Sequence, residues 1–517
     1  MPVVRSGAAG SLAQAPERHR KMKDQVPQDF GRQMLSSVRW VLALRSVAQL
    51  FTWLSTLIVV RFLTPDDYGL NAMLEAPLEI MMLVCTLGID AALVRRPADR
   101  HEDIQAAFGW LIIVNGVLFT TYFFGAPLIA DYFDEARLEP IARTLSFLFF
   151  LVPLRAIPNA LLDRELKFKS KALVELIAAV IAAIVTLTLA VQGAGVWALV
   201  IGYLTNKVLS AVGLMVVHPW LVWPKFGVPI GEMLKFGGLL TLASILTLIA
   251  DRLVSIIAGP TIGPDLLGVY AVAIHISLIP ISKTMPIIGP ILFPTFARIQ
   301  DDRDMTARYF VKIVSITYVL FLPIVVGLAI TAEETVPLVF GEAWASLPLP
   351  LALICIAMPF RLISQLVRPM VSGLGRADIP VAGSATRLVV LIPLVLIAQQ
   401  HGLVALAAIW LIVEPIVAVT VLRMASKEIG LHLAAVIRGI LPAFASATAM
   451  GLGVLLMKSV VNVNAVALLV LEILIGASLY LAVMKLAFRD TFASTFEVLF
   501  SRSRANGASQ STQGAET

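Results

Sequence analysis

The chain has 517 residues, of which 58% are hydrophobic and only 14% are charged, and its mean hydropathy is +0.88. A soluble domain is nearer half apolar and a quarter charged, so this composition excludes a soluble globular protein and predicts an integral membrane protein. Cys85 and Cys355 both lie in apolar segments and the six histidines are scattered, so we expect neither a disulfide framework nor a metal site. The net charge of +6 is spread over many short segments, so we expect no nucleic-acid partner.

Residues 1–38 are polar and basic and lack the apolar region of a signal peptide, which predicts a flexible cytoplasmic tail. Apolar segments of about 20 residues follow, the length that crosses a bilayer as a helix. The sequence therefore predicts about fourteen transmembrane helices, at 40–63, 69–94, 106–130, 141–162, 172–192, 195–217, 236–260, 267–297, 310–331, 347–374, 378–399, 403–423, 433–457 and 463–487. In segment 267–297 we expect a kink or an unwound stretch at its prolines, which are Pro280, Pro286, Pro290 and Pro294.

Successive loops between these segments are alternately rich and poor in lysine and arginine. Loops on one side, together with both tails, collect most of them, whereas the other side holds Arg61, Arg137 and Lys458 beside several acidic residues. Since cytoplasmic loops are enriched in Lys and Arg, both termini are predicted to be cytoplasmic.

An internal repeat divides the chain. The stretch Thr64-Pro65-Asp66-Asp67-Tyr68-Gly69 recurs 199 residues later as Gly263-Pro264-Asp265-Leu266-Leu267-Gly268, and Pro153-Leu154-Arg155 is echoed by Pro359-Phe360-Arg361. The repeat predicts an all-α membrane protein with two pseudo-symmetric six-helix halves and a C-terminal helix pair, an architecture typical of transporters. The expected units are a tail at 1–38, halves at 39–223 and 224–430, the helix pair at 431–488 and a cytoplasmic tail at 489–517.

Three stretches carry a family resemblance: Arg61 to Gly69, Leu161-Leu162-Asp163-Arg164-Glu165-Leu166-Lys167-Phe168, and Asp251 followed by Leu267-Gly268-Val269-Tyr270. Over residues 35–490 the chain resembles the polysaccharide transporter family, the Wzx-type flippases. These belong to the superfamily of multidrug and toxin extrusion transporters and the lipid II flippase. The resemblance implies a non-enzymatic flippase that moves an undecaprenyl-pyrophosphate-linked oligosaccharide across a bacterial inner membrane for exopolysaccharide, capsule or O-antigen synthesis. Polymerases and glycosyltransferases of the same pathway are implied partners, beside membrane lipids.

Basic residues inside the apolar segments are candidate substrate ligands, because charges at membrane depth are costly and usually face a cavity or a partner. At 1.5 Å per residue, Arg155, Lys283 and Arg361 lie deep in the membrane, whereas Arg45 and Arg368 lie nearer its inner side. Arginine and lysine suit a pyrophosphate. The sequence thus predicts Arg45, Arg155, Lys283, Arg361 and Arg368 as substrate-binding residues, although snorkelling to lipid headgroups is the alternative, above all for Arg45 and Arg368.

Acidic residues at depth allow two readings. Glu79 and Asp251 are predicted either to couple transport to a proton or sodium gradient or to pair structurally with Arg45 or Arg155. Asp251 and its neighbour Arg252 point about 100° apart, so each needs a partner elsewhere. Arg387 and Glu414 are expected to form a structural pair. We expect no cofactor.

Two other functions compete with the flippase. A drug or cation antiporter of the same superfamily needs an acidic, aromatic-lined cavity for a cationic cargo, which the basic excess at depth disfavours. A membrane glycosyltransferase or ligase needs a sizeable loop with acidic or metal-binding residues, and the longest loops on the outer side have only about 15 residues. The sequence contains no Walker motif, so ATP hydrolysis is not expected.

Overall fold

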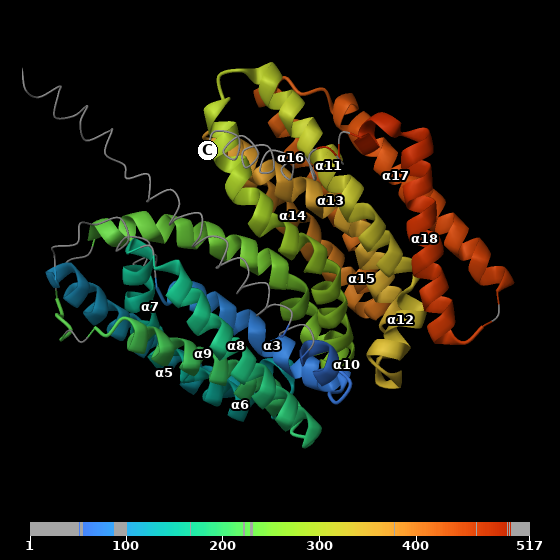
Figure 1. The fold of residues 1–517 in the computed structure, drawn as a ribbon. Helices are drawn as coiled ribbons and strands as arrows, with labels where there is room; N and C mark the ends of the chain where they lie inside the picture. Colours follow the sequence, from blue (N-terminus) through green and yellow to red (C-terminus); the bar gives the residue numbers. More distant parts are fainter. Residues whose placement is uncertain are drawn as a thin grey trace, which may run out of the picture.

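The computed structural model describes residues 51, 55–86, 101–165, 167–220, 223–227, 231–376, 378–461, 463–493, 495 and 497. Within these residues the regular structure is helical and contains no strand, which confirms the predicted all-α class. The helices form two groups that meet at one end of the molecule (Figure 1).

The first group, here the N lobe, holds six helices among the described residues. Its first helix begins where the sequence supplies both start signals: Thr64 Oγ1 accepts from the Asp67 amide, Asp67 Oδ2 accepts from the Thr64 amide at 2.9 Å, and Pro65 is the first helical residue. The predicted helix at 69–94 therefore begins four residues earlier. The N lobe comprises α3 (Pro65–Val84), α5 (His101–Phe133), α6 (Leu138–Ser146), α7 (Leu148–Arg164), α8 (Phe168–Val191) and α9 (Val196–Val217).

The predicted helices 236–260 and 267–297 are joined in one long element, α10 (Gly231–Arg298). Its only non-helical backbone is at Gly263, with φ 76° and ψ 172°, a conformation that suits glycine. The prolines after it do not unwind the helix. Of the two alternatives expected at these prolines, a kink or an unwound stretch, the structure rules out the unwound stretch, because in a membrane-spanning helix neighbouring helices and local adjustments tolerate the lost backbone bonds.

The second group, here the C lobe, follows α10. Most of its bounds lie within a few residues of the predicted ones. A short helix, α12, was not predicted; it carries Glu333 and Glu334 in its first turn and lies across the end of α11. The C lobe comprises α11 (Arg303–Ile330), α12 (Ala332–Val339), η1 (Glu342–Trp344), α13 (Pro348–Gly373), α14 (Asp378–Ala398), η2 (Gln399–His401), α15 (Leu403–Ala408), α16 (Trp410–Ile429), α17 (Leu433–Val460) and α18 (Ala465–Ala487).

Eleven helices among the described residues are long and apolar enough to cross a membrane. The difference from the predicted fourteen has three sources. Segment 40–63 lies largely outside the described residues, α3 carries four acidic residues that lower its hydropathy, and two predicted helices are continuous in α10.

Helix α10 connects the two lobes. It packs against α3 and α5 of the N lobe and against α13, α14 and α15 of the C lobe. In Figure 1 it runs along the N lobe and reaches the end where both lobes meet. This end, which holds the turns around residues 60–69, 263–268 and 338–344, is called the closed end below. Helix α11 packs against α13 and α17, and α17 pairs with α18 at the edge of the C lobe.

Candidate substrate cavity between the lobes

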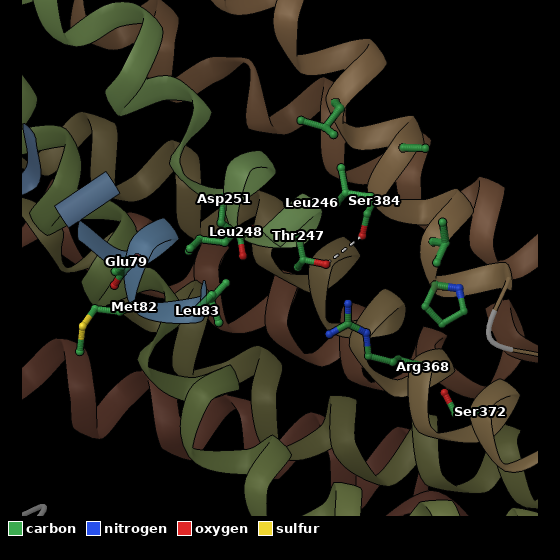
Figure 2. A pocket seen from close by; sticks show the side chains of 14 residues that line it. Glu79, Met82, Leu83, Leu246, Thr247, Leu248, Asp251, Arg368, Ser372 and Ser384 are labelled. Atoms are coloured by element: carbon green, nitrogen blue, oxygen red, sulfur yellow. Dashed lines mark hydrogen bonds between the residues drawn. The ribbon is translucent and has the colours of Figure 1, made fainter. Parts of the chain in front are cut away.

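A cavity of about 820 Å³ lies between the lobes. Its lining positions on α3 come 14 to 18 residues after Pro65, so the cavity is at least about 20 Å from the closed end at 1.5 Å per residue. The wall is mostly aliphatic with a few polar groups, the usual character of a ligand site. The lining residues are Glu79, Met82, Leu83, Leu246, Thr247, Leu248, Asp251, Arg368, Ser372, Pro380, Val381, Ser384, Ala385 and Leu388 (Figure 2).

Arg368 on α13 is the basic residue of this wall. Its side chain is exposed, and among the described residues it makes no ion pair or hydrogen bond. Figure 2 shows its guanidinium group directed toward the side where Thr247 Oγ1 and Ser384 Oγ lie 3.4 Å apart. Arg368 therefore offers an unengaged guanidinium group beside hydroxyl groups from α10 and α14.

Asp251 on the wall of the cavity belongs to a ring of four alternating charges, here the C-lobe cluster. Its Oδ1 atom lies 2.8 Å from Arg361 Nη2 and 3.5 Å from Arg387 Nη1. On the far side of the two arginines, Glu414 lies 3.2 Å from Arg361 and 3.1 Å from Arg387. The predicted pairing of Arg387 with Glu414 is confirmed. Among the described residues the ion-pair partners of Asp251 are Arg361 and Arg387 and not Arg155, whereas Arg45, the other expected partner, lies outside these residues.

The C-lobe cluster is formally neutral and mostly buried. The side chain of Arg361 is 7% exposed and that of Glu414 is fully buried, whereas Asp251 is 35% exposed because it faces the cavity. The Arg361 guanidinium also lies 5.9 Å from the centre of the Trp410 ring, and the Trp410 indole donates to the Tyr270 hydroxyl. Arg361 is thus held by two carboxylates and an aromatic ring, and it does not line the cavity.

Arg252, the neighbour of Asp251, points to the other lobe, as predicted for adjacent residues on a helix. Its Nε and Nη2 atoms donate to both oxygens of Glu79, at 2.7 and 2.8 Å, and Nη1 lies 2.8 Å from Glu75. The Asn71 amide donates to Glu75 at 2.7 Å. Arg252, Glu75 and Glu79, here the interlobe cluster, have two carboxylates for one guanidinium group.

Arg155 lies in the N lobe and does not line the cavity. Its Nε atom is buried without a hydrogen-bond partner among the described residues. On α9 of the same lobe, the Lys207 amine lies 4.9 Å from the centre of the Tyr203 ring. The N-lobe interior therefore holds a second basic group.

The structure brings Glu79, Asp251 and Arg368 together in one cavity wall and separates them from Arg155, Lys283 and Arg361. Arg45 lies outside the described residues. Lys283 is half-buried on α10 after the Gly263 break. The expectation that Arg155, Lys283 and Arg361 share one lumen is not met in this cavity.

Two charged residues near the cavity and in the N lobe, Glu75 and Lys207, were not predicted from the sequence. Glu75 lies one helical turn before Glu79, a spacing that places both carboxylates on one face of α3. Lys207 interrupts an apolar segment just as Arg155 does. Both signals were available, but neither residue belongs to the internal repeat that directed attention to Arg155 and Arg361.

Sequence comparison finds relatives across most of the chain. Residues 58–348 match a family described as "Polysaccharide biosynthesis protein". The chain is 28% identical over 371 residues to the lipopolysaccharide biosynthesis protein WzxC of Escherichia coli K12, covering 69% of this chain and 73% of that protein. It is 24% identical over 425 residues to the teichuronic acid biosynthesis protein TuaB of Bacillus subtilis 168, covering 79% and 86%.

Solved structures share the fold. The lipid II flippase MurJ in an inward closed conformation superposes with a TM-score of 0.69 at 14% identity, covering 88% of this chain and all of that one. An inward-facing multidrug resistance transporter of the MATE family superposes with a TM-score of 0.60 at 17% identity, covering 75% and 98%. The two-lobed helical arrangement is therefore one that transporters of this superfamily adopt.

Proposed function

The chain belongs to the family of polysaccharide biosynthesis proteins, and we propose that it is a flippase for undecaprenyl-pyrophosphate-linked oligosaccharide units. It works in a bacterial inner membrane with both termini in the cytoplasm. The product serves exopolysaccharide, capsule or O-antigen synthesis, with polymerases and glycosyltransferases of the same pathway as partners.

The observation that carries this proposal is the position of Arg368. An exposed guanidinium group without an ion-pair partner among the described residues faces the cavity between the lobes. A guanidinium group matches two phosphate oxygens with parallel hydrogen bonds, and Thr247 and Ser384 add hydroxyl donors beside it. We assign the pyrophosphate to Arg368, while the prenyl chain stays in lipid.

The mechanism is alternating access between the two lobes. With the termini inside, the closed end faces outward and the cavity is reached from the cytoplasm, so the lipid-linked oligosaccharide enters from the inner leaflet. Rocking of the lobes then opens the closed end. Binding shifts this equilibrium only by its differential affinity for the two states. Arg361 acts through Asp251, whose carboxylate it holds at the cavity wall.

The alternative is a drug or cation antiporter. Glu79 and Asp251 give the cavity two carboxylates, which a cationic cargo would favour. However, Glu79 is engaged by Arg252 and Asp251 by Arg361 and Arg387, whereas Arg368 is unengaged among the described residues. The available charge on the wall therefore favours an anionic cargo. Coupling to a proton or sodium gradient is part of the proposal, and dissipating each gradient separately tests it.

Replacing Arg368 tests the function. Arg368→Ala and Arg368→Glu should abolish polymer export while the protein still accumulates in the membrane, and Arg368→Lys should retain part of it because the charge remains but the planar fork is lost. Arg423→Ala is the matched control, since Arg423 is exposed but does not line the cavity. Full export in Arg368→Glu, or resistance to cationic dyes on overexpression without any effect on polysaccharide, would support the antiporter instead.

A further inference from the structure

The two copies of the internal repeat meet face to face at the closed end. In each copy a proline is followed four positions later by a glycine, as Pro65 and Gly69 at the start of α3 and as Pro264 and Gly268 after the break in α10. A β-carbon added at Gly69 would overlap the Pro264 carbonyl group, and it would lie 2.7 Å from the Pro264 α-carbon. The same addition at Gly268 would overlap the Pro65 carbonyl oxygen, and it would lie 2.8 Å from the Gly69 nitrogen.

This contact is reciprocal: each glycine receives the proline carbonyl of the other copy. The atoms that meet are backbone atoms, so no flexible side chain can move aside for an added methyl group. Small residues allow membrane helices to approach at backbone distance. Both glycines lie in helical segments and neither has a positive φ, so their role here is close approach and not backbone conformation.

Contacts between the same turn and the C lobe surround the glycine pair. The buried Trp344 indole donates to the Val60 carbonyl at 3.3 Å, and its ring meets the Tyr68 ring edge-on at 5.4 Å. Arg61 donates to the carbonyls of Leu338 and Val339 at the end of α12, at 2.5 and 3.1 Å. The closed end is therefore sealed by segments that belong to different lobes.

We propose that the reciprocal Gly69–Gly268 contact is the outer gate of the transporter, and that the absence of a side chain at both positions sets how much of the protein is closed at this end. This rests on the alternating-access part of the proposed function. An added methyl group raises the energy only of the state in which the two repeats touch, because the repeats separate when this end opens. Either glycine replaced by alanine should therefore shift the population toward the state that is open at this end.

The test measures distances between spin labels in full-length protein in lipid nanodiscs, with Cys85 and Cys355 replaced by alanine. Labels at Ala136→Cys and Ala343→Cys report on the closed end, and labels at Lys169→Cys and Gln300→Cys report on the opposite end; all four residues are exposed. Gly125→Ala is the matched control, because a β-carbon added to this helical glycine meets nothing within 4 Å.

In Gly69→Ala and in Gly268→Ala, the ratio of open to closed protein should rise at least about fivefold, the change produced by the lower end of the usual cost of overpacking. The outer distance should lengthen and the inner distance should shorten together. The double variant should shift less than the product of the two single shifts, because the small separation that one methyl group forces on the closed state already relieves part of the other overlap.

Three results would overturn the proposal. One is a distance distribution in both alanine variants that matches Gly125→Ala. Another is a longer outer distance without a shorter inner one, which would mean local distortion. The third is a mainly long outer distance in the protein that retains both glycines, a result that does not depend on whether the variants fold. These distances are measured without substrate, so failure of the gate leaves the substrate assignment standing, and normal export in Arg368→Glu leaves the gate standing.

Discussion

Two clusters of arginine and carboxylate lie on either side of the α10 backbone, and they differ in balance and in exposure. The C-lobe cluster has two arginines for two carboxylates, and its Glu414 is fully buried. The interlobe cluster has one arginine for two carboxylates, and its side chains are 28% to 39% exposed. Charges removed from water must be matched completely, whereas charges beside a wet cavity can remain unbalanced.

The comparison separates structural from functional charge in this protein. A balanced ring inside one lobe joins α10, α13, α14 and α16 and leaves no charge for a ligand. The unbalanced cluster between the lobes includes Glu79, whose carboxylate lines the cavity. Arg361, a deep arginine of the repeat, is engaged by two carboxylates, whereas Arg368 has no ion-pair partner among the described residues.

Breaking the buried ring should have the largest effect. Glu414→Ala leaves Arg361 and Arg387 facing Asp251 alone, so one buried positive charge is uncompensated, and we expect a loss of about 3 to 5 kcal/mol in stability. The thermal unfolding of detergent-solubilised protein measures it. As a control, Glu333→Ala removes an exposed carboxylate, with an expected loss below about 1 kcal/mol. Equal losses in the two variants would contradict the distinction.

Opening the interlobe cluster should cost less. Arg252→Ala leaves Glu75 and Glu79 without their guanidinium partner, but their side chains are 37% and 39% exposed, so we expect a loss of about 1 to 2 kcal/mol in the same unfolding measurement. Arg252→Lys should recover part of this stability, because the charge returns without the bidentate geometry. If Arg252→Ala lost as much stability as Glu414→Ala, the exposure of an ion pair would not determine how much stability its loss removes in this protein.

The smallest loss of stability is expected from breaking an exposed ion-pair network. Between α5 and α6, Arg137 lies 2.6 Å from Asp66 and 2.7 Å from Glu135, and the Arg137 side chain is 53% exposed. Hydrogen bonds from Arg137 lower the pKa of Glu135 below its usual value. This stabilisation is complete above the unfolded pKa, near 4.5, and disappears as the pH falls through the lower folded value.

Arg137→Ala should therefore lower stability by less than about 1 kcal/mol at pH 7, and by less still at pH values below the folded pKa of Glu135, where Arg137 has lost one of its two partners. Unfolding temperatures of the parent protein and the variant, measured from pH 7 downward, should converge. Differences that persist unchanged at the acid end would mean that Arg137 stabilises the loop by packing and not by charge.

Much of the fold could be predicted because its signals are local. The length of the apolar segments gave the helices, and the capping residues Thr64 and Asp67 with Pro65 mark the start of α3. Helix α12 was not predicted, because its eight residues include two glutamates and form no apolar segment. The continuity of α10 could not be predicted, because whether Gly263 ends a helix or only bends it depends on the helices packed around it.

The candidate site was harder to predict. Depth along a helix placed Arg361 and Asp251 correctly inside the lobes, but depth does not say which face of a helix meets which neighbour. Asp251 and Arg361 are 110 residues apart and come together only through the packing of α10 on α13. For the same reason, the sequence could identify Arg368 as basic and shallow without showing that the cavity wall passes through it.

The two neighbours on α10 attach this helix unequally to the rest of the protein. Asp251 is anchored to two arginines of the C lobe, whereas Arg252 is anchored to two carboxylates on the single helix α3. The first anchorage is largely shielded from water and the second is wetted by the cavity, so separation of the lobes ruptures the second before the first. In the proposed alternating access, the first part of α10 should therefore stay with the C lobe and part from α3, because breaking the buried link to Arg361 and Arg387 costs more than breaking the exposed link to Glu75 and Glu79.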